Sequence, residues 1–175
     1  MGYVMEFYVD GGCRNNGRPY ATGAAAACLM SRGHQRFWTQ TRRLPTGDYF
    51  ATSQRAELLA IVIALEWALE KYEDLDSYPH LSVDIYSDSR YAVGCITDWI
   101  YKWLDNGWTN TKGGDVANRD LIQELSDLDD RVKELGVVNY HYTPREQNEN
   151  ADKACNDALD EIEELEDESE SDDDW

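Results

Sequence analysis

Four acidic residues fall at the expected ends and starts of regular segments, and this placement constrains the fold more than any other feature of the sequence. Asp10 follows an alternating apolar stretch, residues 3–9, and precedes Gly11-Gly12, where we expect the strand to end. Asp88 follows a second strand-like stretch, residues 82–87. Two carboxylates placed in this way are expected to meet at one edge of a sheet.

The other two acidic residues belong to helical patterns. Glu57 lies in the first turn of the strongest helical pattern, residues 53–72, and Asp152 begins the last helix, from residue 150 onward. Oxygen ligands that converge without His or Cys are suited to Mg²⁺ or Mn²⁺. The four residues therefore predict a metal-dependent phosphodiester hydrolase.

The order of the remaining segments predicts an α/β fold. Three strands come first and are separated by short turns, which favours antiparallel neighbours, whereas the later strands are separated by helices. The predicted order βββαβααβα gives a five-stranded mixed sheet flanked by helices. Besides those given above, the expected strands are residues 24–30, 34–41 and 137–142, and the expected helices are residues 90–104 and 118–135.

Charge divides the chain unevenly. Of its 35 acidic residues, 11 lie in residues 160–175, which contain no Lys or Arg. Such a segment buries too little apolar surface to offset its ordering entropy. We therefore expect one domain, residues 1–159, followed by an acidic tail, residues 160–175, which frays into disorder from about Glu163.

Several classes of protein are excluded by the composition. No apolar stretch approaches the roughly 18 residues that span a bilayer, and no basic segment followed by an apolar core begins the chain. We expect no membrane contact, a monomer, and a cytoplasmic location, or a nuclear one in a eukaryote. The four cysteines form no C-x-x-C pair, so neither a zinc site nor a redox motif is indicated.

Four segments, in order, resemble the signature segments of type 1 ribonuclease H, a family of the ribonuclease H-like superfamily. They are Asp10-Gly11-Gly12-Cys13-Arg14-Asn15-Asn16-Gly17, Thr52-Ser53-Gln54-Arg55-Ala56-Glu57, Tyr86-Ser87-Asp88-Ser89-Arg90-Tyr91 and Asn148-Glu149-Asn150-Ala151-Asp152. The resemblance covers residues 3–159 and implies a ribonuclease H-like fold. It also implies an endoribonuclease that hydrolyses the RNA strand of RNA-DNA hybrids and leaves 5′-phosphate products.

The resemblance implies roles for the four carboxylates around two Mg²⁺ ions, for which Mn²⁺ can substitute. Asp10 would bridge both ions, Asp152 would complete the site that activates water, and Glu57 with Asp88 would hold the ion at the leaving group. Two ions about 3.5–4 Å apart stabilise both the attacking and the leaving oxygen. The alternative for Asp88 and Asp152 is a helix cap, a position in which Asp is favoured.

The resemblance also implies contacts with nucleic acid. Asn16 and Gln54, with Ser53 beside them, would contact the minor groove and the ribose 2′-hydroxyls that distinguish RNA from DNA. Thr52 and Asn118 would bind a phosphate of the DNA strand. The alternatives are a turn-forming role for Asn16 and a polar helix start for Gln54.

Tyr91, Trp99 and Trp103 match aromatic positions that form a channel for the DNA strand. The two tryptophans are four residues apart on one expected helix, so they share a face. The alternative for this row is a packed core stripe.

Two further features depart from many members of the family. Arg145 stands where many members have a mobile His, as in the branch that lacks this His, and Arg cannot take a proton near neutral pH. We include Arg145 among the catalytic residues as a positioning group. Residues 100–118, which correspond to a basic projection in many members, carry as many acids as bases, which weakens the attraction for phosphate.

Two alternatives stay open for the function. The chain could be a catalytically weak nucleic-acid-binding or replication-assembly module of the same fold. The acidic tip that ends in Trp175 resembles the C-terminal tips of single-stranded-DNA-binding proteins. It could dock on a replication protein, compete with nucleic acid for the basic residues of this chain, or act only as a solubilising extension.

Overall fold

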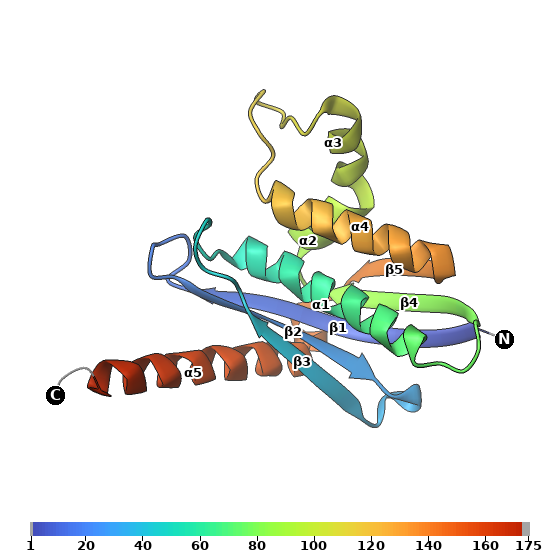
Figure 1. Cartoon of the computed structure of the whole chain (residues 1–175), viewed down its shortest axis with the longest axis horizontal. Coiled ribbons are helices and arrows are strands. Elements are labelled where there is room, and N and C mark those ends of the chain that lie inside the picture. The colour runs from blue at the N-terminus through green and yellow to red at the C-terminus, as the bar shows by residue number, and fades with distance from the viewer. Residues whose placement is uncertain (1, 173–175) are drawn as a thin grey trace.

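The five strand patterns pair into one mixed sheet in the order β3-β2-β1-β4-β5 (Figure 1). The structure is a computed structural model, and it describes residues 2–172. Strands β1, β2 and β3 are antiparallel neighbours, while β4 is parallel to β1 and β5 is parallel to β4. The main elements are β1 (Gly2–Arg14), β2 (Thr22–Met30), β3 (Phe37–Arg43), α1 (Ser53–Glu73), β4 (His80–Ser87), α2 (Arg90–Gly94), α3 (Ile100–Asn106), α4 (Arg119–Leu135), β5 (Gly136–Tyr142) and α5 (Glu149–Asp172).

Strand β2 lies between two apolar layers. Ala25 and Ala27 belong to the main core with α1, whereas Ala24 and Ala26 pack with α5 on the opposite face of the sheet. Alanine has a weak preference for strands, and burial on both faces decides its conformation here. Its small side chain also lets α1 and α5 come close to the sheet.

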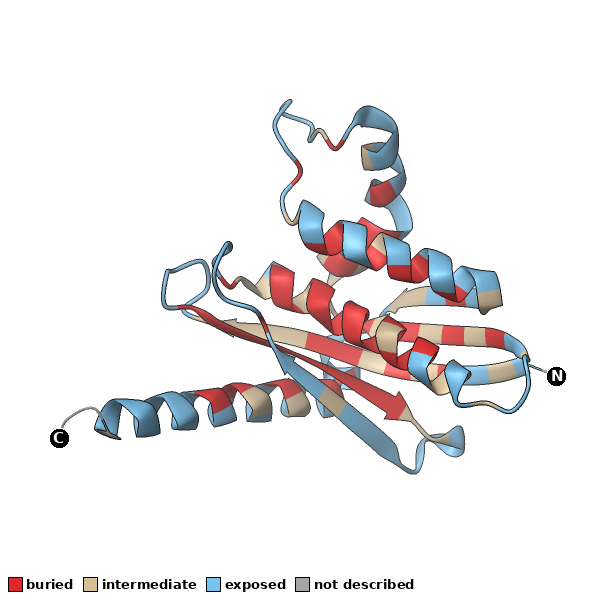
Figure 2. Cartoon of the chain, viewed as in Figure 1, coloured by how far each residue is buried: buried red, intermediate tan, exposed pale blue. Residues whose placement is uncertain are grey.

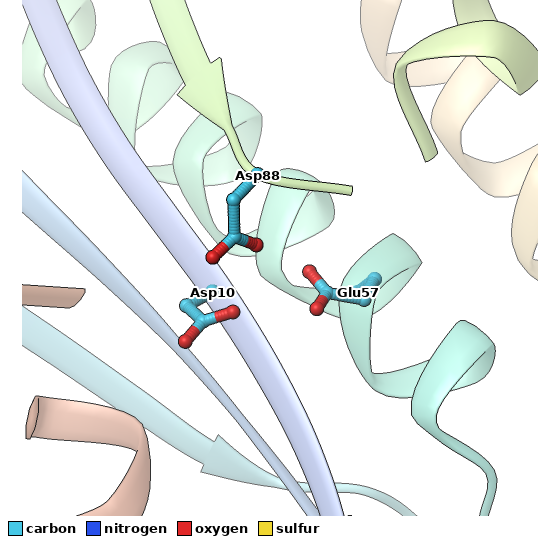
Figure 3. Close-up of side chains that lie close together, drawn as sticks. All are labelled: Asp10, Glu57 and Asp88. Carbon is cyan, nitrogen blue, oxygen red and sulfur yellow. The ribbon is translucent and has the colours of Figure 1, made fainter. Parts of the chain in front are cut away.

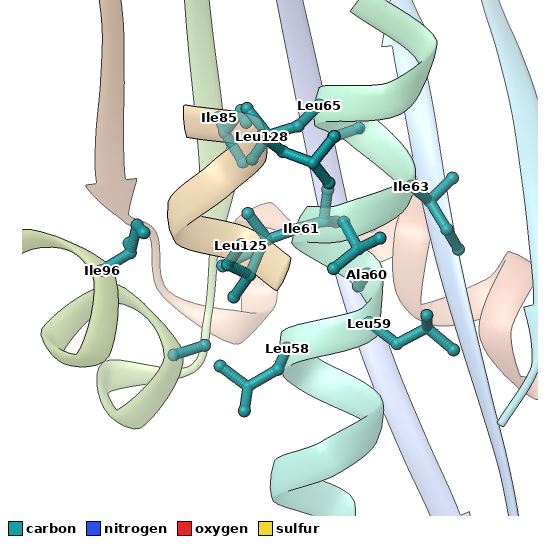
Figure 4. Close-up of a cluster of buried hydrophobic side chains, with 14 of the residues drawn as sticks. Leu58, Leu59, Ala60, Ile61, Ile63, Leu65, Ile85, Ile96, Leu125 and Leu128 are labelled. Atoms are coloured by element: carbon teal, nitrogen blue, oxygen red, sulfur yellow. The ribbon is translucent and has the colours of Figure 1, made fainter. Parts of the chain in front are cut away.

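Helix α1 is buried on almost every side, because it lies between the sheet and α4 (Figures 2 and 4). Thr52 caps it: the Thr52 hydroxyl accepts a hydrogen bond from the Arg55 backbone N–H at 3.2 Å. Leu58, Ile61 and Leu65 are fully buried in the core that α1 shares with α4. This packing fixes the start of α1, and with it Glu57, relative to the sheet.

Strand β1 does not end before Gly11-Gly12, as we expected from the sequence. It continues to Arg14 because residues 7–14 pair with residues 22–29 of β2, with Asp10 opposite Ala26. Asp10 therefore lies inside a strand. A glycine pair is compatible with a strand where another element approaches the backbone closely.

Two other boundaries differ from the sequence prediction. Strand β3 begins at Phe37, because residues 32–34 form a 3-10 turn in which both Gly33 and His34 have positive φ. The helix expected over residues 90–104 is continuous to Asn106, but Cys95–Trp99 is wound as a π-helix. A π-turn of this kind rotates the residues that follow it relative to an α-helix.

Helix α5 continues to Asp172, well past Glu163, where we expected disorder to begin. Arginines from the sheet hold its acidic side chains: Arg14 contacts Asp160 and Glu163 at 2.7 Å each, and Arg43 contacts Glu166 at 2.6 Å. The predicted boundary at residue 160 thus falls inside a helix. The tip that includes Trp175 lies outside the described residues, and within residues 2–172 no helix has the length and apolarity to span a membrane.

Candidate metal centre

Three of the four predicted carboxylates meet at one place in the fold. One oxygen from each of Asp10, Glu57 and Asp88 lies within 4.8 Å of the other two, and the three side chains point toward one another (Figure 3). Asp10 comes from the middle of β1, Glu57 from the first turns of α1, and Asp88 from the bend after β4. Segments far apart in the sequence therefore form one oxygen-only cluster.

The sheet register explains how the two aspartates become neighbours. Val9 of β1 pairs in parallel with Ser87 of β4, so the next residues along the two strands are Asp10 and Asp88. Asn148 adds a link to the last helix, since its side-chain amide donates to the Val9 carbonyl at 2.8 Å while fully buried. Its motif position was visible in the sequence, but this structural role was not.

Gly11 allows Glu57 to reach the aspartates. A Cβ at Gly11 would lie 2.2 Å from the Ala56 carbonyl carbon and 2.4 Å from the Glu57 nitrogen. Only glycine permits this approach of the α1 backbone to β1. The glycine thus serves close packing, and not the strand end that we predicted from it.

The cluster is electrostatically unfavourable without a cation. Burial, reinforced by the charges of Asp88 and Asp152, raises the pKa of Asp10 to about 7. Burial, with the charges of Asp10 and Asp88, raises the pKa of Glu57 to about 10. Within residues 2–172, the buried Glu57 Oε2 also has no hydrogen-bond partner. A metal ion would satisfy this oxygen and offset the repulsion between the carboxylates.

Asp152 faces the same site from the start of α5. It lines a cavity of ≈ 450 Å³ together with the three clustered carboxylates, and Arg145 lies at the rim with its guanidinium 3.6 Å from Asp152 Oδ1. The Arg145 side chain is 78% exposed and is free to meet a ligand. The other residues that line the cavity are Gly11, Gly12, Cys13, Arg14, Ser53, Tyr142, Cys155, Asn156 and Leu159.

The residues expected to contact RNA lie beside this cavity. Asn16 Oδ1 accepts a hydrogen bond from the Ser53 backbone N–H at 3.0 Å, which ties the β1–β2 turn to the start of α1. Ser53 lines the cavity and Gln54 is exposed next to it. Asn16 is also exposed. The arrangement combines the turn-forming role with an accessible polar surface.

The residues expected to bind a DNA phosphate form a polar group around Arg55. Asn118 donates to the Tyr91 hydroxyl at 2.8 Å and accepts from Arg55 at 3.4 Å. Burial raises the pKa of Tyr91 to about 12, so its hydroxyl keeps its proton at neutral pH. Arg55 is buried and makes two hydrogen bonds to Asp120, at 2.9 and 2.7 Å. The sequence did not reveal this pair, because its members are 65 residues apart.

The expected aromatic row is present on the helices after β4. The ring centres of Tyr91 and Trp99 lie 6.2 Å apart, and those of Trp99 and Trp103 6.1 Å apart. Trp103 also stacks on the buried Trp108 and is packed against the main core, whereas Trp99 is 37% exposed. Trp99 therefore offers an accessible ring. Trp103 is partly packed in the core, as the alternative of a core stripe predicts.

Comparisons with known proteins agree with this arrangement. The sequence profile of the family described as RNase H matches residues 3–160. Ribonuclease H of Nitrosomonas eutropha is 32% identical over 158 residues, which cover 90% of this chain and 91% of that protein. Ribonuclease H of Bradyrhizobium sp. strain ORS 278 is 31% identical over 160 residues, which cover 89% of this chain and 90% of that protein.

Solved structures of the same kind share the fold. RNase H1 from the halophilic archaeon Halobacterium salinarum superposes with a TM-score of 0.59 and 21% identity, covering 91% of this chain and 99% of that one. LC11-RNase H1, solved in complex with an RNA/DNA hybrid, superposes with a TM-score of 0.58 and 18% identity, covering 90% and 98% of the two chains. These likenesses confirm the predicted mixed sheet flanked by helices.

Proposed function

Because this chain belongs to the ribonuclease H family, we propose that it hydrolyses the RNA strand of RNA-DNA hybrids endonucleolytically, leaving 5′-phosphate products. The observation that carries the proposal is the convergence of Asp10, Glu57 and Asp88 within 4.8 Å, with Asp152 lining the same cavity. Hydrolysis of a phosphodiester requires stabilisation of negative charge on the attacking and leaving oxygens. An all-oxygen cluster suits the hard divalent cations that provide it.

We propose that the site takes two Mg²⁺ ions, with Mn²⁺ as a substitute, because all its donors are carboxylate oxygens. Asp10 would hold both ions, Asp152 would help to hold the ion beside the attacking water, and Glu57 with Asp88 would hold the ion beside the leaving group. When bound, such ions supply Lewis acidity and lower the pKa of a coordinated water. The orphaned Glu57 Oε2 and the raised pKa values of Asp10 and Glu57 support this assignment, since each is relieved by a cation.

Arg145 is proposed as the group that positions the phosphate, as in the branch of the family that lacks the mobile His. Its exposed guanidinium lies at the cavity rim, 3.6 Å from Asp152. His141, the nearest His in the sequence, is engaged elsewhere: it contacts Asp84 at 2.8 Å and stacks on Tyr86. Arg145→Ala should lower kcat about tenfold, and Arg145→Lys should recover part of this loss if charge near the phosphate is what matters. A kcat unchanged in Arg145→Ala would exclude the role.

The two strands of the hybrid are proposed to bind on opposite sides of the start of α1. Asn16, Ser53 and Gln54 face the RNA strand, where polar side chains can contact ribose 2′-hydroxyls. The DNA strand would contact a second group, in which Asn118 links Arg55 to Tyr91. The second group comprises Thr52, Tyr91, Trp99, Trp103 and Asn118.

We further propose that residues 1–159 form the catalytic domain of a monomeric cytoplasmic enzyme, and that the acidic segment 160–175 is an accessory to it. A replication protein that binds the tip ending in Trp175 stays a prediction. A pull-down with and without Trp175 would test it, because loss of the terminal ring should abolish capture. Capture that does not depend on Trp175 would exclude the tip as the docking element.

The test of the function is an assay with a hybrid whose RNA strand is labelled at its 5′ end. We expect cleavage at internal positions in Mg²⁺ or Mn²⁺, none in EDTA, and none with duplex DNA. Asp10→Asn should reduce turnover more than a hundredfold, a barrier change of about 2.7 kcal/mol. Binding of the hybrid without cleavage in either metal would instead identify a binding module. Full activity in EDTA would overturn the metal-dependent mechanism.

A further inference from the structure

Arg90 carries a charge beside the metal cavity that the four carboxylates do not neutralise. It is the first residue of α2, two positions after Asp88, and it is exposed. Its guanidinium carbon lies 3.9 Å from the centre of the Tyr142 ring. Within residues 2–172, no carboxylate lies within 4.0 Å of Arg90, although acids outnumber bases 35 to 16 in the whole sequence.

Tyr142 is fixed at the cavity wall by the sheet. It is the last residue of β5, it pairs in register with Ser87 of β4, and the next backbone N–H, of Thr143, donates to the Ser87 carbonyl at 2.9 Å. Its ring lines the same cavity as Asp88 and Arg145. A cation held over an aromatic ring stays in place and keeps its full charge and its N–H donors for another partner.

Arg14, which lines the cavity, shows the contrast with Arg90. Arg14 is held by two carboxylates of α5, Asp160 and Glu163, at 2.7 Å each. An arginine neutralised in this way offers less attraction to a phosphate than one held by a ring. A cavity lined by four carboxylates repels the anionic backbone of a nucleic acid, so an unneutralised cation at its edge has the chemistry to offset that repulsion.

We propose that Arg90 binds a phosphate of the strand that is cut, next to the phosphate at the metal centre, and that Tyr142 is the positioning residue that holds Arg90 there. This inference rests on the proposed function, since it requires a nucleic-acid strand to pass through the cavity. The strand at the carboxylate cluster is the one within reach, because Tyr142 lines that cavity. Arg90 therefore contributes to binding of the RNA strand near the cleavage point.

The experiment measures KM and kcat for hybrid cleavage at several salt concentrations. Arg90→Ala should raise KM about tenfold at low salt, with a smaller change in kcat. The slope of log KM against log salt should decrease by roughly 0.7 to 0.9, the value for one lost phosphate contact. Arg131→Ala is the matched control: it removes the same charge from the exposed face of α4, where Arg131 lines a different cavity. It should leave both KM and the slope unchanged.

Variants of Tyr142 separate positioning from mere packing. Tyr142→Phe keeps the ring and should behave like the wild type, whereas Tyr142→Ala should reproduce the KM defect of Arg90→Ala. The double variant Arg90→Ala with Tyr142→Ala should be no worse than either single variant, because both disrupt one interaction. Additive defects, or a KM and slope unchanged in Arg90→Ala, would overturn the proposal. A wild-type protein that fails to cleave hybrid would refute the proposed function instead, so the two failures are distinguishable.

Discussion

At the scale of single residues, the protonation of Asp10 connects the metal centre to stability. Its pKa is about 7 in the folded metal-free protein, against the ordinary value of 3.8 for an exposed aspartate. Between these values the folded chain binds more protons than the unfolded chain, so stability decreases as pH rises through this window. Glu57, with a pKa of about 10, extends the decrease to higher pH.

Asp10→Asn should remove the part of this pH dependence that Asp10 causes. In EDTA, the melting temperature of the wild type should fall from pH 5 to pH 8, whereas that of Asp10→Asn should fall less and be higher at pH 8. Asn has a similar shape but carries no charge to repel Asp88 and Asp152. Thermal melts of both proteins across this range give the comparison. Identical pH profiles would show that Asp10 is not the group that titrates.

The candidate site residues could be predicted from the sequence because they stand in motifs. The residues that they contact in the fold could not be predicted. Asp10, Glu57 and Asp88 could be assigned to one site because each stands in a recognisable segment. The strand end expected at Asp10 was wrong, and the parallel register of β1 and β4 brings the two aspartates together instead. The hydrogen bond from Asn148 to Val9 joins residues 139 positions apart, and nothing local in the sequence indicates it. The same holds for Arg90 and Tyr142, whose contact depends on the register of β4 and β5.

At the scale of elements, the packing of α1 on β1 decides whether Glu57 reaches the cluster. The sequence predicted both elements, but it placed the end of β1 at Gly11-Gly12. Glycine pairs are common in turns, which is why the strand was expected to end there. Only the tertiary contact with Ala56 explains why β1 needs a glycine at position 11. The π-turn Cys95–Trp99 was equally unpredictable, because its residues follow the same apolar spacing as an α-helix.

Gly11→Ala should damage both stability and activity. The added Cβ would lie 2.2 Å from the backbone of α1, so the helix must move and carry Glu57 with it. We expect a loss of about 3 kcal/mol in the free energy of unfolding, at the upper end of overpacking effects, and a large loss of kcat. Gly12→Ala is the control, since its Cβ would meet only side chains, Cys155 and Leu159, at 3.3 Å each. In urea unfolding, Gly11→Ala should have a much smaller free energy of unfolding than Gly12→Ala. Equal free energies of unfolding would contradict the role of Gly11 in the close packing of α1 on β1.

Substitution of the two tryptophans on the helices after β4 should distinguish a role in hybrid binding from a role in core packing. Trp99→Leu should raise KM for the hybrid about tenfold with little change in melting temperature, because its exposed ring is available for stacking. Trp103→Leu should also lower the melting temperature, because Trp103 packs on Trp108. The nearby Tyr101, which is exposed but outside the row, supplies the control Tyr101→Leu. A reduced melting temperature with unchanged KM in Trp99→Leu would assign the whole row to the core.

At the scale of the whole molecule, the acidic helix α5 is paired with arginines of the sheet, one of which, Arg14, lines the metal cavity. Arg14 lines the cavity and is paired with Asp160 and Glu163, and Arg43 is paired with Glu166. The acidic segment and its competition with nucleic acid for basic residues were both predicted from the sequence. The helical conformation of this segment beyond Glu163 was not predicted, because it depends on these pairings. Carboxylates in these positions compete with phosphate for the same guanidinium.

Neutralising the two acids that hold Arg14 should strengthen hybrid binding at low salt. For Asp160→Asn with Glu163→Gln we expect KM to fall severalfold at about 0.05 M salt, and the difference from the wild type to shrink toward 1 M, where the screening length is only about 3 Å. Glu168→Gln with Glu170→Gln changes the net charge by the same amount on the same helix. Within residues 2–172 these two acids contact no basic side chain, so this control isolates the effect of net charge. An equal decrease in KM for both double variants would show that only net charge matters. A lower melting temperature with unchanged KM would show that the ion pairs of Arg14 serve only to hold α5 on the sheet.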